Sequence, residues 1–161
     1  MVEVREWSRQ DTRAHLRVPG DGDDKYSRGV VAIRTGSPAY PGAAVLGVEA
    51  AWRTGAGFVR YVGGARESDA VIARRPETVT GTDVGKTRPD AWVIGTGTDS
   101  ADRSDAENAA LGEILSGSAR VVVDAGALDL ARGATAPVLV TPHAGEFARL
   151  RAQLGFTARE G

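Results

Sequence analysis

The sequence predicts an α/β domain of three layers, in which a mainly parallel β-sheet carries helices on both faces. Short, almost continuously apolar runs alternate with longer helical patterns along the chain, which is typical of a parallel sheet covered on both sides. Four of these runs end in glycine, serine, aspartate or histidine and then pass into a helix. Ligands bind at that edge of an open parallel sheet, so the same pattern predicts a small-molecule site.

The composition limits the classes of protein that remain. The 161 residues are 42% hydrophobic and 25% charged, and acidic and basic residues interleave to a formal net charge of -1. This balance gives no electrostatic footprint for nucleic acid, and no apolar run approaches the length of a membrane span. The chain has no cysteine and two histidines, His15 and His143, which are too few for a zinc site. We expect no protein-built metal site, and a cytoplasmic enzyme or binding protein.

The first elements follow from turn residues and apolar runs. Residues 1–24 are predicted as a lead-in, because 19–24 is an acidic, turn-rich stretch, and the domain is expected over 25–161. A buried strand is predicted at 30–34, where β-branched residues lie between two glycines. The segment 43–54 contains no proline and many small residues, and a glycine follows it. It therefore predicts a helix that can lie close to a sheet.

The middle of the chain repeats this pattern. A second strand is predicted at 58–62, where two glycines end an apolar run. The following helix, 67–74, stops before Pro76. The polar, turn-rich segment 77–90 is predicted to contain no regular element, and a third strand is expected at 91–95.

The last elements complete the alternation. Ser104 lies three residues before Glu107, a spacing that predicts a capping box at the start of a helix over 105–115. The remaining predicted elements are a strand at 120–124, a short helix at 127–132, a strand at 137–141 and a helix at about 145–153.

Two strand exits are rich in glycine. The loop 36–42 leads to a helix N-terminus, where unpaired backbone N–H groups favour a phosphate or a polar ligand edge. Small residues there would let a flat ring approach the backbone, although an ordinary strand-to-helix turn has the same pattern. The loop 95–99 has two glycines two residues apart, which permits positive φ or close approach of a ligand. Many tight turns share that feature.

The other two strand exits carry titratable residues. Asp124 follows three valines and could face a ligand or a cation, or could cap the short helix after it. His143 is the histidine expected at this edge, and an imidazole suits an amide-bearing substrate because it can donate or accept a hydrogen bond. The alternative is that His143 only caps the next helix, in whose first turn Glu146 lies.

The segment 81–87 is similar to a phosphate-binding P-loop. It is one residue short between its glycines, it follows no predicted strand, and Arg88-Pro89 prevents a helix from continuing. A surface loop is therefore the better interpretation, and no Ser-His-Asp or paired-carboxylate arrangement can be assembled.

Several colinear segments resemble one known family, the ADP-dependent NAD(P)H-hydrate dehydratases. The similarity covers about residues 25 to 150 and is carried by 24–31, 36–46, 53–57, 121–125 and 141–150. The resemblance implies a ribokinase-like α/β fold, of which 25–161 would be the N-terminal part. It also implies repair of hydrated NADH and NADPH, with ADP or ATP as co-substrate, Mg²⁺, and release of AMP and phosphate.

The resemblance also implies which residues bind the substrate. Ala43, Gly97 and His143 would contact the hydrated nicotinamide nucleotide. The family's nucleotide-binding Lys-Gly segment and its Gly-Thr-Gly-Asp turn, which carries the proposed base, belong to a further part of the family pattern. No catalytic residue is therefore assigned here, and Asp99 is not given that role. A homo-oligomer and an NAD(P)H-hydrate epimerase partner are further expectations.

The sequence departs from the family pattern at two places. The family's Gly-Pro-Gly-Leu-Gly loop is replaced by residues 95–99, and the second Asp of the family's Asp-Ala-Asp is Gly126. Two other functions therefore stay open. One is a non-catalytic remnant or dinucleotide-binding module. The other is a ribokinase-like kinase of a small alcohol, which would also need the Gly-Thr-Gly-Asp turn.

Overall fold

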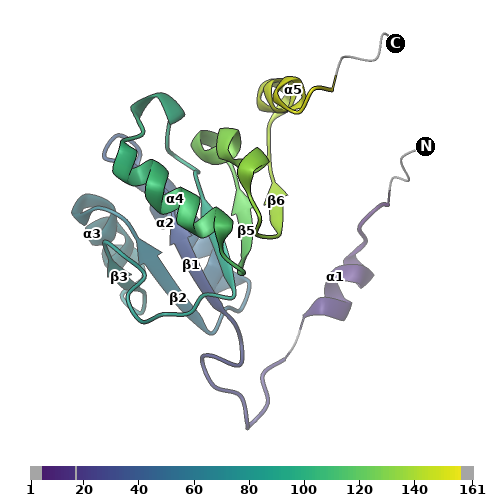
Figure 1. Cartoon of the computed structure of the whole chain (residues 1–161). Coiled ribbons are helices and arrows are strands. Elements are labelled where there is room, and N and C mark those ends of the chain that lie inside the picture. The colour runs from purple at the N-terminus through teal and green to yellow at the C-terminus, as the bar shows by residue number, and fades with distance from the viewer. Residues whose placement is uncertain (1–4, 17, 157–161) are drawn as a thin grey trace.

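A computed structural model describes residues 5–16 and 18–156 as a six-stranded parallel sheet in the order β3-β2-β1-β4-β5-β6 (Figure 1). The strands are β1 Val30–Arg34, β2 Phe58–Val62, β3 Val79–Gly81, β4 Ala91–Ile94, β5 Arg120–Val123 and β6 Val138–Val140. The helices are α1 Arg9–His15, α2 Pro41–Arg53, α3 Ala65–Arg74, α4 Asp105–Ser116 and α5 Ala144–Gln153, with 3₁₀ segments η1 Ser100–Asp102 and η2 Ala125–Gly133.

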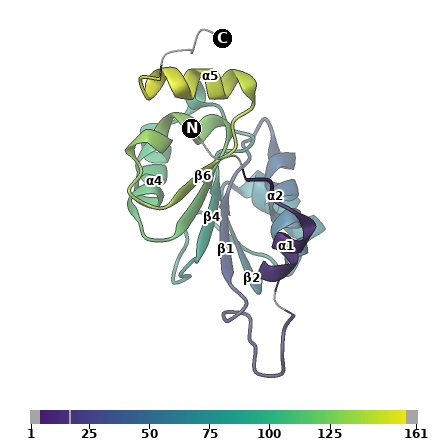
Figure 2. The same ribbon diagram turned by 90° about the vertical axis from the view of Figure 1, so that its right-hand side faces the viewer.

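The strand order makes the sheet doubly wound, with its switch point between β1 and β4. The helices α2 and α3 pack on one face, and α4 and η2 pack on the other, which the two perpendicular views show (Figures 1 and 2). The predicted three-layer α/β fold is therefore confirmed. None of the helices in the described part of the chain is long and apolar enough to cross a membrane.

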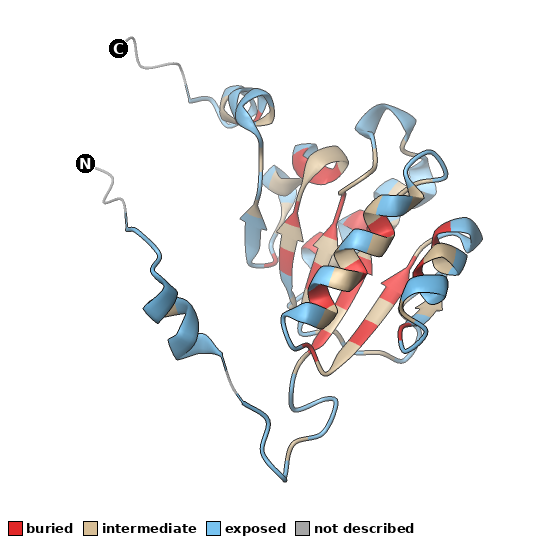
Figure 3. Ribbon diagram, turned by 180° about the vertical axis from the view of Figure 1, so that it is seen from behind, coloured by how far each residue is buried: buried red, intermediate tan, exposed pale blue. Residues whose placement is uncertain are grey.

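The period-two alternation of a central strand explains how one sheet fills two cores. Ile33 packs with Val48 of α2, whereas its neighbour Ala32 packs with Leu111 of α4. Leu111 is 3% exposed and the other three side chains are fully buried. Strands buried on both faces read as continuous apolar runs. Figure 3 shows this burial concentrated in the middle of the sheet.

The structure corrects the prediction that 77–90 contains no regular element. Val79–Gly81 forms the edge strand β3, which pairs in parallel with β2. Val79 is exposed and Thr80 is half-buried, so the strand lacks the apolar signature of its neighbours. The P-loop-like segment 81–87 therefore does follow a strand, contrary to prediction. No helix follows it before β4, and it remains a surface loop.

Two further differences concern helices. The predicted lead-in contains α1, whose Ser8 and Asp11 form a capping box and which buries no residue. It lies apart from the sheet (Figures 1 and 3). The short helix predicted at 127–132 is the longer 3₁₀ segment Ala125–Gly133. Positions 1–4, 17 and 157–161 of the predicted lead-in and domain lie outside the described residues.

A cluster of charges joins α2 to the segment after α3. Glu49 of α2 accepts hydrogen bonds from Arg75 and from Arg53, the latter at 2.6 Å between Nε and Oε1. The hydrogen bond from Arg75, followed by that from Arg53, lowers the pKa of Glu49 from 4.5 to about 2. The ionised carboxylate is therefore the form that the fold stabilises.

This pKa predicts an acid-dependent stability. Because the folded pKa of Glu49 is depressed, its contribution is present above pH 4.5 and is lost as the pH falls towards about 2. We expect Glu49→Gln to flatten the fall in the free energy of unfolding over this range, measured by urea unfolding at a series of pH values. Glu113→Gln, at an exposed position of α4, should keep the wild-type slope. Equal slopes for wild type and Glu49→Gln would contradict the assignment.

Candidate functional site

The exits of β1 and β4 touch each other at the switch point of the sheet. The backbone N–H of Gly36 donates to the carbonyl of Thr96 at 2.7 Å. Gly97 has φ 73°, and a Cβ built there would lie 2.3 Å from the Cβ of Ala43 in the first turn of α2. Only glycine fits such an approach. Two of the three predicted binding residues, Ala43 and Gly97, are thus in contact where a doubly wound sheet binds ligands.

Asp124, at the exit of β5, links the neighbouring strand exits. Its Oδ2 accepts from the hydroxyl of Thr96 at 3.1 Å, and its Oδ1 accepts from the hydroxyl of Thr141 at 2.9 Å. Its side chain makes no capping bond to η2, so the capping alternative is wrong. The next residue, Ala125, has a positive φ of 43°, a strained conformation of the kind that clusters at functional sites. Asp124 positions three turns of the site edge.

His143 lies at the exit of β6, two strands away from β4 in the sheet. It is the N-cap of α5, with Nδ1 accepting from the N–H of Gly145 at 3.1 Å while Glu146 accepts from its backbone N–H at 2.9 Å. The structure therefore shows the capping role. The side chain is 70% exposed, so it is not sealed in the core. It lies apart from Ala43 and Gly97, and its contact with substrate stays a prediction.

A cavity of about 450 Å³ opens at the carboxyl ends of β1 and β2, between α3 and α4. Arg34 at the end of β1 forms one wall and donates through Nε to Glu107 Oε1 at 2.8 Å, with a second bond between Nη2 and Oε2. Ser104 does accept from the N–H of Glu107. The predicted capping box is nevertheless only half formed, because the Glu107 carboxylate pairs with Arg34 across the cavity.

The inner end of this cavity holds two buried polar side chains that the sequence analysis did not single out. Tyr61, fully buried, donates to the carbonyl of Thr35 at 2.8 Å. Glu67, in the first turn of α3, is 3% exposed. Burial, and secondarily the charge of Glu67, raise the pKa of the Tyr61 phenol, so it stays a donor. The sequence pattern that could have pointed to them is the pair Gly63-Gly64, which follows the strand of Tyr61 and precedes an acidic residue in the first turn of a helix.

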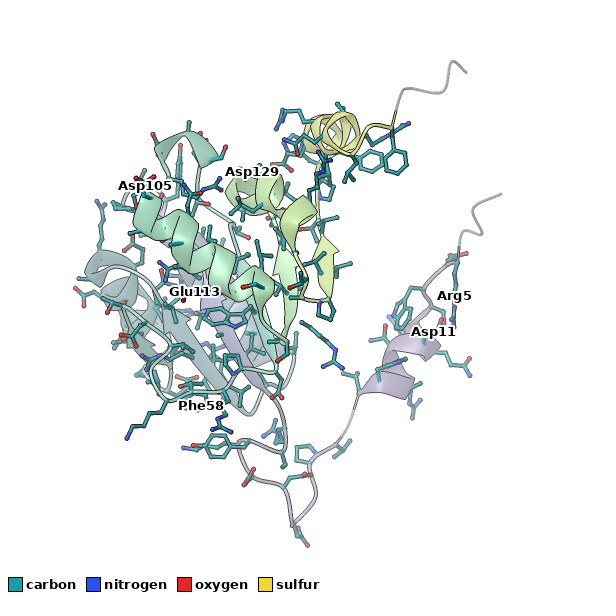
Figure 4. All side chains as sticks on the ribbon, viewed as in Figure 1. Arg5, Asp11, Phe58, Asp105, Glu113 and Asp129 are labelled. Atoms are coloured by element: carbon teal, nitrogen blue, oxygen red, sulfur yellow. The ribbon has the colours of Figure 1, made fainter. Side chains whose placement is uncertain are left out.

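A smaller cavity of about 180 Å³ lies between η2 and α5 and is lined in part by Glu146 and Asp129. Arg103 binds Asp129 and also donates to the carbonyl of Gly126 at 2.6 Å. Figure 4 shows Asp129 at the same end of the molecule as Asp105, which begins α4. Within residues 5–16 and 18–156, no group of three or more His, Asp or Glu side chains could hold a metal ion.

The conformation of the loop 95–99 is fixed by a hydrogen bond within the loop and by contacts with η1 and the β5 exit. The hydroxyl of Thr98 donates to the carbonyl of Gly95 at 2.6 Å. Asp99 lines the cavity and accepts from the N–H of Ala101 at 2.9 Å as the cap of η1. A Cβ built on Gly126 would lie 2.4 Å from the carbonyl oxygen of Thr98. The loop and the β5 exit therefore fit each other only while residue 126 has no side chain.

The sheet order and the paired glycine turns define a doubly wound α/β domain with a small-molecule site at its switch point. The comparisons with known proteins specify the family. A family model described as NAD(P)H-hydrate dehydratase matches residues 31–159, and the chain belongs to this family.

Two curated relatives are both named for action on NAD(P)H-hydrate. The bifunctional NAD(P)H-hydrate repair enzyme Nnr of Mycobacterium tuberculosis is 42% identical over 157 residues, covering 92% of this chain and 32% of the relative. The ADP-dependent (S)-NAD(P)H-hydrate dehydratase of Xanthomonas campestris is 34% identical over 161 residues, covering 86% of this chain and 55% of the relative. The chain thus spans between a third and little more than half of these relatives.

Solved structures agree with the predicted ribokinase-like fold. The ADP/ATP-dependent NAD(P)H-hydrate dehydratase from Bacillus subtilis, co-crystallised with ATP and Mg²⁺, has a TM-score of 0.78 at 25% identity and is matched over 94% of this chain and 57% of its own. A ribokinase-like superfamily protein from Enterococcus faecalis has a TM-score of 0.72 at 24% identity, matched over 84% of this chain and 52% of its own. The second match supports the fold alone.

The role of Asp124 can be tested by stability. Asp124→Ala leaves the hydroxyls of Thr96 and Thr141 without their acceptor, so we expect the free energy of unfolding to fall by about 1–3 kcal/mol. Chemical denaturation measures this loss. The control Asp69→Ala, at an exposed position of α3, should change stability by less than about 0.5 kcal/mol. Equal effects of the two substitutions would show that Asp124 does not hold the strand exits.

Proposed function

We propose that this chain provides the substrate-binding edge of an ADP-dependent (S)-NAD(P)H-hydrate dehydratase. This lyase removes water from hydrated NADH or NADPH, coupled to conversion of ADP into AMP and phosphate. The observation that carries the proposal is the contact between Ala43 and Gly97 at the switch point. It occurs in a member of this family and involves two residues that the family resemblance assigns to the substrate.

The residues at this edge can bind and orient a flat, polar ring. Pro41 at the start of α2 has no N–H, and the N–H of Ala43 donates to the carbonyl of Tyr40 at 3.2 Å. The N–H of Gly42 is therefore the donor that the first turn can offer to a ligand. The lack of a side chain at position 97 lets its loop pack directly against Ala43, and the ring would lie beside this contact. ADP, when bound, supplies a phosphoryl group that turns the substrate hydroxyl into a better leaving group. The described residues would hold the ring that carries that hydroxyl.

His143 is proposed to hydrogen-bond the substrate from the exit of β6. Its Nδ1 accepts from the N–H of Gly145, and its Nε2 lies 3.4 Å from Oε1 of Glu146. The exposed ring can reach a ligand lying across the carboxyl edge of the sheet, and the hydrogen bond at Nδ1 fixes its orientation. His143 would therefore position substrate rather than transfer a proton.

Mg²⁺ is proposed to enter with the nucleotide. Because the described part of the chain offers no cluster of three or more oxygen and nitrogen ligands of the required kind, phosphate oxygens would have to complete its coordination. A cytoplasmic location, a homo-oligomer and an epimerase partner stay predictions. The repair enzyme of Mycobacterium tuberculosis is named as bifunctional, which supports the expected association with an epimerase.

A second candidate function is dinucleotide binding without turnover. It requires only the edge at which Ala43 and Gly97 meet, and none of the described residues has been assigned a catalytic role. Purified protein with hydrated NADH, ADP and Mg²⁺ separates the two functions. Recovery of the reduced-nicotinamide absorbance supports the dehydratase. Saturable binding of hydrated NADH without recovery supports the binding module, and absence of both would refute the proposal.

The two histidines form a matched pair for testing the site. We expect His143→Ala to weaken the binding of hydrated NADH about three- to tenfold, the loss expected for one neutral hydrogen bond. His15→Ala changes a residue of α1 far from the sheet edge and should leave the affinity unchanged. Isothermal titration calorimetry measures both. Unchanged affinity in His143→Ala would remove this residue from the site.

A further inference from the structure

The carboxylate of Glu67 lies at the inner end of the 450 Å³ cavity with no donor to satisfy it. The residue is 3% exposed and lines the cavity. None of the described residues donates a hydrogen bond to it or forms an ion pair with it. Its neighbour Tyr61 donates to the carbonyl of Thr35 instead. Among the described residues, the fully enclosed side-chain atom without a partner is the hydroxyl oxygen of Thr35, so the Glu67 carboxylate stays open to the cavity. A cation that enters the cavity would stabilise this carboxylate.

Nearby positive charges are already engaged. The cavity lining contains two guanidinium groups, of which Arg34 is bound to Glu107 and Arg103 to Asp129. Four carboxylates line the same cavity, those of Glu67, Asp99, Asp102 and Glu107. The N-terminus of α3 favours a negative charge at Glu67, but it supplies no hydrogen bond. The cavity therefore has a negative inner end that lacks a cation.

Two glycines before α3 leave space for the polar side chains at the inner end of the cavity. A Cβ built on Gly64 would lie 2.6 Å from Oε2 of Glu67, and one built on Gly63 would lie 2.3 Å from the hydroxyl oxygen of Tyr61. Side chains at these two positions would displace both polar groups. The pair of glycines thus leaves room for the carboxylate and the phenol at the inner end of the cavity.

We propose that this cavity is a binding site for a small ligand with an apolar body and a primary ammonium group, which Glu67 holds. The ammonium group would donate to the Glu67 carboxylate and replace the missing counter-charge. The apolar body would lie against Pro38, Val62 and Leu111, which line the cavity. A volume of about 450 Å³ is within the range of small-molecule sites. The cavity shares residues of the loops 36–42 and 95–99 with the proposed substrate edge, but the inference rests on Glu67 and not on dehydratase activity.

Three probes of similar size and different charge test the proposal on the complete chain. Benzylamine, benzyl alcohol and benzoate are titrated into ¹⁵N-labelled protein, and amide shifts are followed by NMR. We expect saturable shifts of the Gly63 and Gly64 amides with benzylamine, weaker ones with benzyl alcohol and none with benzoate. Benzoate binding as tightly as benzylamine, or no saturable benzylamine binding, would overturn the proposal.

Substitutions assign the binding to the carboxylate. Glu67→Gln should weaken benzylamine binding about tenfold or more, because a charge-assisted hydrogen bond is lost. Glu113→Gln, a matched change on the exposed face of α4 (Figure 4), should leave it unchanged. Melting temperature separates this role from a structural one. Loss of an uncompensated buried charge should leave it equal or higher, whereas a structural role predicts a lower value with benzylamine affinity unchanged.

A second variant keeps the test decisive if Glu67→Gln does not fold. Gly64→Ala retains the charge but places a methyl group 2.6 Å from the present position of Oε2. The carboxylate belongs to a flexible side chain that can move, and φ -70° at this position suits alanine. We expect weaker benzylamine binding with the fold preserved. Unchanged binding would show that the carboxylate's position does not matter and would refute the site.

Discussion

The candidate site depends on a chain of hydrogen bonds that joins four strand exits. It runs from the N–H of Gly36 to the carbonyl of Thr96, from the Thr96 hydroxyl to Asp124, and from the Thr141 hydroxyl to the other oxygen of Asp124. The strands themselves pair through backbone groups over only three or four positions each. Beyond those positions, these bonds fix how the turns face one another. Asp124 accepts from both sides, so the β5 exit is the centre of the arrangement.

Charged pairs that do not belong to this series of hydrogen bonds connect helices to the sheet and to each other. Arg34 ties the end of β1 to α4 through Glu107, and Arg103 ties the segment before α4 to η2 through Asp129. Each guanidinium is held by a carboxylate from another element. This pairing gives both arginines fixed positions at the site edge, and it leaves the buried Glu67 without a counter-charge. The same network that orders the cavity walls thus produces its negative inner end.

The sequence predicted the layers of the fold, and the turns that meet at the switch point, better than the detailed contacts between strand exits. Buried parallel strands can be predicted from apolar runs. Small residues after these runs indicated the turns in which Ala43 and Gly97 meet. The edge strand β3 was missed because it pairs with β2 alone and is largely exposed, so its residues form no apolar run. The partners of Asp124 and the isolation of Glu67 arise between segments far apart in the chain. Local periodicity carries no information on such contacts.

The two departures from the family pattern lie against each other. The loop 95–99 differs from Gly-Pro-Gly-Leu-Gly, and Gly126 stands where the pattern has aspartate. A Cβ on Gly126 would come within 2.4 Å of both the carbonyl and the hydroxyl oxygen of Thr98. A side chain at 126 would therefore require another path for this loop. Residue 126 and the path of the loop therefore constrain each other, because a side chain at 126 would occupy the space of Thr98.

The two departures leave the switch point intact. Gly97 keeps its positive φ and its contact with Ala43, and the Thr96 carbonyl still accepts from Gly36. The packing of Thr98 against Gly126 lies on the side of the loop that faces β5, whereas the contact of Gly97 with Ala43 lies on the side that faces α2. Divergence from the family pattern at 98 and 126 is thus compatible with a retained binding edge, because the two sides of the loop are constrained by different neighbours.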